Sequence, residues 1–125
     1  MKKIISTNKA PAAIGPYSQA TAHNGVIYVS GQLPVDPATG ELSFGNVSEQ
    51  TNLALNNVKA IVEAAGSSMD KVLKCTILLT DMACFAQMNE AYEKFFQSEP
   101  PARICYEVTA LPKGAIIEID CIAVE

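Results

Sequence analysis

The sequence has few of the residues on which metal sites and common nucleophilic couples depend. Its one histidine, His23, lies beside the turn sequence Asn24-Gly25, and its four cysteines show no C-x-x-C spacing. Zinc sites and Ser-His or Cys-His couples need histidine or closely spaced cysteine. We therefore expect no metal site and a solvated His23. We also expect four reduced cysteines, namely Cys75, Cys84, Cys105 and Cys121.

Basic residues and long apolar runs are also scarce. Nine Lys and Arg residues stand against 13 Asp and Glu, the net charge is -4, and the basic residues are scattered. Nucleic-acid binding usually needs clustered basic residues, so we expect no nucleic-acid partner. The N-terminus has no apolar run of signal-peptide length, and nowhere do eighteen apolar residues follow one another. These absences predict a cytoplasmic protein without a membrane partner.

Hydrophobic residues make up 49% of the 125 residues, and charged residues only 18%. This balance predicts one globular domain over residues 1–125, with further apolar surface covered in an oligomer.

Turn residues divide the N-terminal half into short strands. Lys3-Ile4-Ile5 is a candidate strand, and residues 19–23 and 26–30 flank Asn24-Gly25. Asn-Gly tolerates positive φ at both central positions, which predicts a type I′ hairpin. Residues 32–44 read as a turn-rich loop.

Two segments have helical periodicity, and an apolar run separates them. Asn46 followed by Glu49 predicts a capped helix that ends at Gly66. Val72 to Leu79 is typical of a central strand covered on both faces. Asp81 is expected to cap a second helix, whose apolar stripe runs from Phe85 to Phe96 and ends near Pro100-Pro101.

The C-terminal end places an arginine, a thiol and two carboxylates on two strands. Alternation sends Arg103 and Cys105 to one face of the first strand, and Glu118 and Asp120 to one face of the second. If the strands form a hairpin centred on Leu111-Pro112, Cys105 pairs with Glu118. A cation able to hold a carboxylate would then lie beside a group able to hold water, which outlines a small-molecule site.

The element order β-β-β-α-β-α-β-β predicts an α+β fold. We expect two layers, with a mixed sheet of about six strands and both helices on one face. The other face then needs a partner, and we expect another copy of the chain.

Three of the C-terminal residues have two interpretations each. Arg103 either has a structural role, in a salt bridge to Glu107 or Glu118 or at the rim of a subunit interface, or it binds an anionic ligand. Cys105 is either a small core residue or a reactive thiol. Glu118 either lies on a solvated face or orients a water molecule for attack.

Four residues outside this region are candidates for ligand contact. Tyr17 follows a rigid Gly-Pro turn and is either a packing anchor or a ligand contact. Ser30-Gly31 ends a strand and marks either a bulge or a close approach by a ligand. Asn89 interrupts the apolar stripe of the second helix, so it needs a polar partner, either a backbone group of the sheet or a molecule bound nearby.

Several motifs together resemble the Rid (YjgF-type) family, in order along nearly the whole chain. They are Gly15-Pro16-Tyr17-Ser18-Gln19-Ala20, Tyr28-Val29-Ser30-Gly31-Gln32, Met88-Asn89-Glu90-Ala91-Tyr92 with Phe95-Phe96, Pro101-Ala102-Arg103, Leu111-Pro112-Lys113-Gly114 and Ile117-Glu118-Ile119. With both Arg103 and Cys105 present, the chain is most similar to the enamine/imine deaminase branch.

The resemblance implies a chorismate-mutase-like fold and a homotrimer with sites between subunits. It implies hydrolysis of 2-iminopropanoate and 2-iminobutanoate to 2-oxo acids and ammonia, without metal or cofactor. These reactive species leave pyridoxal-phosphate enzymes, so the implied role is metabolite damage control. Arg103 would hold the substrate carboxylate, Glu118 would position water, and Cys105 would line the site. Further cleft-lining positions implied by the family are Tyr17, Ser30, Gly31 and Asn89.

Two alternatives remain open at this point. A trimeric module that binds small carboxylates, or acts as a chaperone, would use the same arginine without turnover. Endoribonuclease activity or translation inhibition, attributed to some relatives, is disfavoured by the acidic composition and the single histidine.

Overall fold

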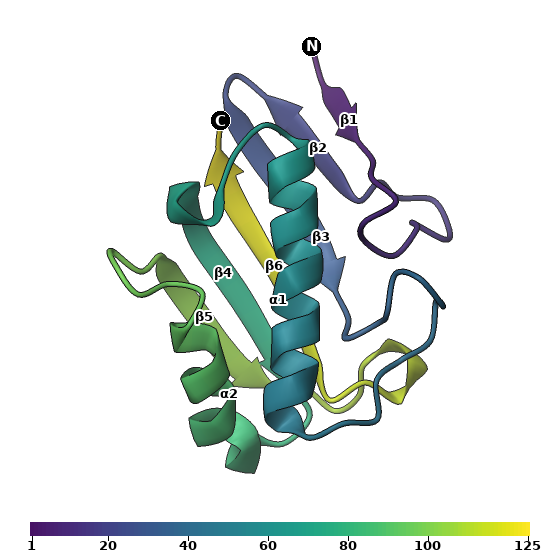
Figure 1. The fold of residues 1–125 in the computed structure, drawn as a ribbon, viewed down its shortest axis with the longest axis vertical. Coiled ribbons are helices and arrows are strands. Elements are labelled where there is room, and N and C mark those ends of the chain that lie inside the picture. The colour runs from purple at the N-terminus through teal and green to yellow at the C-terminus, as the bar shows by residue number, and fades with distance from the viewer.

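The computed structural model describes residues 1–125 and contains one six-stranded sheet with two α-helices on one face (Figure 1). The strand order is β1-β2-β3-β6-β4-β5, and only β4 and β5 run parallel. This arrangement confirms the predicted α+β class and element order. The elements are β1 (Lys3–Ile5), β2 (Ala20–His23), β3 (Val26–Gln32), α1 (Val47–Ala64), β4 (Val72–Leu79), α2 (Phe85–Glu93), β5 (Ala102–Glu107) and β6 (Ile117–Val124).

The N-terminal hairpin has the predicted turn. Strands β2 and β3 pair up to His23 and Val26, directly beside the turn. Asn24 has a φ of 51° and Gly25 a φ of 78°, the two positive values that a type I′ turn requires. The Asn-Gly signal therefore predicted both the turn and the register of the hairpin.

Helix α1 begins and ends where the sequence indicated. The Asn46 side chain accepts a hydrogen bond from the backbone N–H of Glu49 at 2.9 Å, and the Glu49 side chain accepts one from the backbone N–H of Asn46. This reciprocal pair satisfies two N–H groups that the helix leaves free. Gly66, with a φ of 86°, follows the last turn.

Helix α2 is shorter than predicted. The Asp81 side chain accepts a hydrogen bond from Ala83, but it caps a 3₁₀ turn that precedes α2. The helix ends at Glu93, so Phe95 and Phe96 lie beyond it. Phe95 and Phe96 therefore pack against the core from the turns that follow the helix. The apolar stripe seen in the sequence is longer than the helix itself.

The core lies between the helices and one face of the sheet. Replacing one of its large residues with alanine costs about 2–5 kcal/mol of folding free energy. The opposite face of the sheet carries exposed apolar side chains in this single chain, among them Tyr28, Ile104 and Tyr106. Strand β4 is central as predicted, but it is covered on one face only. Fully buried core residues include Ile27, Leu55, Ile61, Ile77, Leu79, Met88, Ile117 and Ile119.

The predicted C-terminal hairpin is wrong. Strand β4 lies between β5 and β6, so Cys105 pairs with Ile77 and Glu118 pairs with Leu78. Strand β6 buries every second residue along its whole length, which suits a place between two neighbours. Strand β5 carries Arg103 at the sheet edge, where the residue is only partly buried, so its charge is spared full desolvation.

Candidate active site

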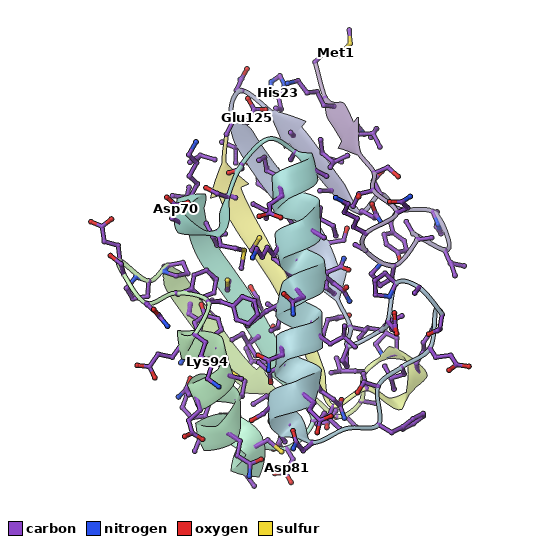
Figure 2. The ribbon with its side chains drawn as sticks, viewed as in Figure 1. Met1, His23, Asp70, Asp81, Lys94 and Glu125 are labelled. Atoms are coloured by element: carbon purple, nitrogen blue, oxygen red, sulfur yellow. The ribbon has the colours of Figure 1, made fainter.

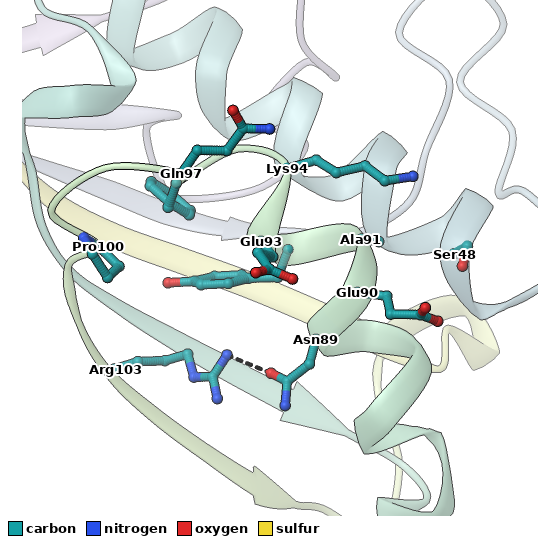
Figure 3. A pocket seen from close by; sticks show the side chains of 11 residues that line it. Ser48, Asn89, Glu90, Ala91, Glu93, Lys94, Gln97, Pro100 and Arg103 are labelled. Carbon is teal, nitrogen blue, oxygen red and sulfur yellow. Dashed lines mark hydrogen bonds between the residues drawn. The ribbon is translucent and has the colours of Figure 1, made fainter.

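Helix α2 holds the side chain of Arg103, the only arginine of the chain. Its Nη1 donates a hydrogen bond to Oδ1 of Asn89 at 2.7 Å (Figure 3). Its Cζ lies 4.9 Å from the ring centroid of Tyr92 and 5.5 Å from that of Phe85. Asn89, which interrupts the apolar stripe, therefore has a partner that the sequence did not predict, because the partner is the Arg103 side chain and not a backbone group of the sheet.

Arg103 has no carboxylate partner within the chain, so both salt bridges considered from the sequence are wrong. The Glu107 side chain instead accepts a hydrogen bond from the backbone of Met82 at 2.9 Å. The one ion pair of the structure joins Lys3 to Glu125. The guanidinium is therefore held in place while its charge is left uncompensated.

Cys105 lies on the same face of β5 as Arg103, two residues along the strand. Desolvation by burial raises the pKa of the Cys105 thiol, and the nearby Arg103 charge opposes this effect only in part. The group is therefore a neutral thiol at neutral pH, which suits a residue that lines a site better than it suits a nucleophile.

Glu118 lies on the opposite face of the sheet from Arg103. In the strand register Glu118 lies beside Leu78, which lies beside Tyr106. Arg103 lies beside Cys75, which is buried and faces the helices. Burial raises the pKa of the Glu118 carboxyl, and the neighbouring Asp120 charge adds to this rise.

A β-bulge at Ser30-Gly31 brings β3 against the Glu118 side chain. The register between β3 and β6 shifts between Val29 and Gln32. A Cβ atom added at Gly31 would lie 2.8 Å from Cδ of Glu118. Of the two alternatives that the sequence left open, the structure confirms the bulge. The group that approaches Gly31 closely is the protein's own Glu118 carboxylate.

Ser30 and Gln19 hold the loop that carries Tyr17. The Ser30 hydroxyl donates to the carbonyl of Ser18 at 2.6 Å. The buried Gln19 amide accepts from the backbone of Thr7 and donates to three carbonyls of the same loop. The Tyr17 ring itself is half exposed.

The predicted site residues therefore form two groups. The arginine group consists of Asn89, Arg103 and Cys105, and the glutamate group consists of Tyr17, Ser30, Gly31 and Glu118. A hollow of about 860 Å³ beside α2 is lined by Asn89 and Arg103, but not by Cys105 or by any residue of the glutamate group. Figure 3 shows Arg103 and Asn89 facing each other there, while Lys94 and Gln97 extend away from them. The hollow is lined by Ser48, Asn89, Glu90, Ala91, Tyr92, Glu93, Lys94, Phe96, Gln97, Pro100 and Arg103.

Sequence reasoning missed the residues that support these groups. The apolar stripe predicts Phe85 and Tyr92 as core residues, although their spacing of four and three residues around Asn89 places all three on one face of a helix. Gln19 lies in the Gly15–Ala20 motif, and the sequence alone does not indicate its role. For Phe85 and Tyr92 the available signal was Asn89, a polar residue on an apolar helix face. Gln19 follows Ser18, so its neighbours in the sequence gave no such signal.

Other kinds of site find little support in the structure. No three or more His, Cys, Asp or Glu side chains come together in a way that could hold a metal ion. His23 lies with Met1 and Glu125 at the end of the sheet opposite Asp81, which precedes α2 (Figure 2). None of the helices has the length and apolar character that a membrane crossing requires.

Comparison with known proteins identifies the family. The model of the Endoribonuclease L-PSP family matches residues 7–125. The chain belongs to this family. A 2-iminobutanoate/2-iminopropanoate deaminase of Bos taurus is 52% identical over 125 residues, which are 100% of this chain and 91% of that protein. A RutC family protein of Pyrococcus horikoshii is 49% identical over 98% of both chains.

Solved structures of this family have the same fold. The YjgF gene product of E. coli has a TM-score of 0.94 at 47% identity, over 98% of both chains. E. coli TdcF with bound serine gives the same values. The resemblance to Rid (YjgF-type) proteins and the chorismate-mutase-like architecture are thereby confirmed.

Proposed function

We propose that this protein hydrolyses 2-iminopropanoate and 2-iminobutanoate to 2-oxo acids and ammonia, in a site that two copies of the chain complete. Relatives about half identical over the whole chain are named imine deaminases, and the chain is accordingly an enzyme acting on C–N bonds. The observation that best supports the site is the oriented but uncompensated guanidinium of Arg103. Such a cation suits the carboxylate of a 2-imino acid.

In the proposed reaction, two N–H groups of Arg103 bind the substrate carboxylate and fix the position of the adjacent imine carbon. Glu118 accepts a proton from a water molecule, whose oxygen attacks that carbon of the protonated imine and forms a tetrahedral carbinolamine. The protonated Glu118 then gives this proton to the amine nitrogen, the C–N bond breaks and ammonia leaves. The carbinolamine hydroxyl passes its own proton to the Glu118 carboxylate, and from there to solvent, as its oxygen becomes the carbonyl of the 2-oxo acid. Cys105 lines the site as a neutral thiol.

A second copy is needed because the two groups lie on opposite faces of one sheet. Arg103 and Glu118 are in strands separated by β4, and each strand spacing adds about 4.8 Å. A substrate of three or four carbon atoms is too small to contact both side chains through the sheet. The arginine group of one copy would therefore meet the glutamate group of its neighbour.

The exposed apolar face of the sheet supports assembly. Tyr28, Ile104 and Tyr106 are each about half exposed on this face in the single chain, and apolar patches of this kind favour association. The homotrimer and the cytoplasmic location expected from the sequence are part of the proposal, as is a role in removing reactive imines.

Two other functions compete with this proposal. The family name includes endoribonuclease, but the single histidine lies at the far end of the sheet and Arg103 is the only arginine. A module that binds carboxylates without turnover would use Arg103 equally well. Replacement of Glu118 separates this module from an enzyme, because only turnover needs the carboxylate that holds water.

The test measures formation of 2-oxobutanoate from freshly generated 2-iminobutanoate, beside a protein-free blank because free imines hydrolyse in water. We expect wild type to accelerate the reaction and folded Arg103→Ala to lose the acceleration. Arg103→Lys should recover little, since lysine keeps the charge but lacks the planar pair of donors. Lys94→Ala is the matched control, because it removes a cation from the same hollow. A wild-type rate equal to the blank would reject the deaminase.

A further inference from the structure

Helix α2 orients Arg103 mainly through the faces of two aromatic rings. Phe85, Asn89 and Tyr92 occupy one face of the helix, and Cζ of Arg103 lies over both rings. A guanidinium has five N–H donors at its edge, and one group of Arg103, Nη1, donates a hydrogen bond to Asn89. Contact through the faces therefore fixes the cation and leaves most of its donors available.

Tyr92 makes the closer of the two contacts and is itself held rigidly. Its ring centroid is 4.9 Å from the guanidinium carbon, against 5.5 Å for Phe85. Its side chain is buried, and its ring packs against Phe96 with a centroid distance of 4.8 Å and a tilt of 42°. Burial raises the pKa of Tyr92, so the ring meets the cation as a neutral phenol.

An aromatic partner differs from a carboxylate in its effect on the arginine. A carboxylate would occupy the edge of the guanidinium and neutralise it, which would block the binding of a substrate carboxylate. An aromatic face attracts the cation through its quadrupole without adding a negative charge or consuming an N–H donor. No carboxylate of the chain pairs with Arg103, and the rings of Phe85 and Tyr92 contact its guanidinium instead.

We propose that Tyr92, assisted by Phe85, is a positioning residue that sets the orientation of Arg103 for the substrate carboxylate. This inference rests on the proposed function of Arg103. The competing explanation is that Tyr92 only fills the core, in which case its loss would reduce stability without a specific effect on the arginine.

Chemical modification of Arg103 tests the inference without turnover. Phenylglyoxal modifies arginine, and with one arginine in the chain the adduct is counted by intact mass. We expect Tyr92→Leu to raise the modification rate of the native protein severalfold and Tyr92→Phe to restore the wild-type rate. Ile27→Ala, a core change under α1, should lower the melting temperature without raising that rate.

Steady-state kinetics provide the second readout. Because Arg103 would hold the carboxylate in both ground and transition states, we expect Tyr92→Leu to raise KM for 2-iminobutanoate about tenfold, with a smaller change in kcat. Tyr92→Phe, which keeps the ring, should restore KM. A modification rate that stays at the wild-type value in Tyr92→Leu, or that rises equally in Ile27→Ala, would overturn the inference.

The two proposals fail in different ways. If wild type does not accelerate imine hydrolysis but the modification rates follow the expected order, the proposed function fails and the positioning role stands. If wild type is an active deaminase and Tyr92→Leu changes neither the modification rate nor KM, the positioning role fails and the deaminase stands.

Discussion

Arg103 and Glu118 lie on opposite faces of one sheet, in strands that β4 separates. Each is placed by its own surroundings, Arg103 by α2 and Glu118 by the bulge of β3. A site that uses both residues on one small substrate must therefore be assembled from two copies of the chain.

Gly31 leaves the space that the Glu118 side chain occupies. Gly31→Ala would place a Cβ 2.8 Å from Cδ of Glu118, and the flexible carboxylate would have to move. We expect kcat to fall about a hundredfold, since misplacement by about 1 Å has such effects, with little change in melting temperature. Gly45→Ala is the matched control, because its Cβ would press in the same way on the Glu49 side chain, a carboxylate outside both groups of site residues. Equal kcat losses in both variants would contradict the assignment.

The raised pKa of Glu118 predicts opposite effects on stability and activity. A carboxyl whose pKa is raised by folding opposes folding once it is ionised, so its unfavourable effect appears as pH rises above the unfolded value. Glu118→Gln should be at least as stable as wild type at pH 7, and the difference should vanish in acid. Its kcat should fall by about 10² to 10⁴. Denaturant titrations at several pH values, paired with the imine assay, measure both effects.

The pH profile of the wild-type enzyme should report the ionisation of Glu118. Activity that needs ionised Glu118 should be lost as pH falls through the pKa of this carboxyl, which burial and Asp120 raise and which the Arg103 charge of a neighbouring copy would lower. A profile with no loss of activity in acid would show that another group controls the attack of water.

Cys105 should be dispensable for bond making. Since desolvation keeps its thiol neutral, we expect Cys105→Ser to retain kcat/KM within about tenfold. Loss of several orders of magnitude, or a covalent adduct trapped from the substrate, would instead make Cys105 the nucleophile. Cys84→Ser, at a partly buried cysteine in the turn before α2, controls for general effects of the substitution.

A charged side chain introduced on the open face of the sheet should make the copies of the chain dissociate. Catalytic activity should be lost at the same time. Tyr28 is half exposed on this face, and Tyr28→Lys would place an ammonium group in an apolar interface. We expect light scattering to report a smaller mass and the imine assay to report a matching loss. Met82→Lys, in the turn before α2, should leave both unchanged. A Tyr28→Lys monomer with full activity would rule out a site made from two copies.

Local signals in the sequence predicted local structure well. Asn24-Gly25 specified its turn because few residues tolerate positive φ, and Asn46 with Glu49 specified the start of α1 because the two side chains cap each other. The bounds of β4, Val72–Leu79, followed from its apolar run. Each of these features depends on residues close together in the sequence.

The partners of β5 and β6 could not be predicted in the same way. Strands adjacent in sequence often pair, which favoured a hairpin, but here β5 pairs in parallel with β4 and leaves β6 to pair with β3 and β4. This choice depends on burial across the whole sheet. The prediction that Arg103 and Cys105 share one face of the strand was correct. The predicted position of Glu118 beside them was wrong, because it depended on the hairpin.

Mixing two inactive variants tests the shared site most directly. Arg103→Ala and Glu118→Ala are unfolded and refolded together, and mass spectrometry confirms that mixed assemblies form. In a ring of copies, each site takes Arg103 from one copy and Glu118 from the next, so about a quarter of sites in an equal random mixture would be intact. The account predicts recovery of about that share of wild-type activity. Mixed assemblies as inactive as their components would contradict it.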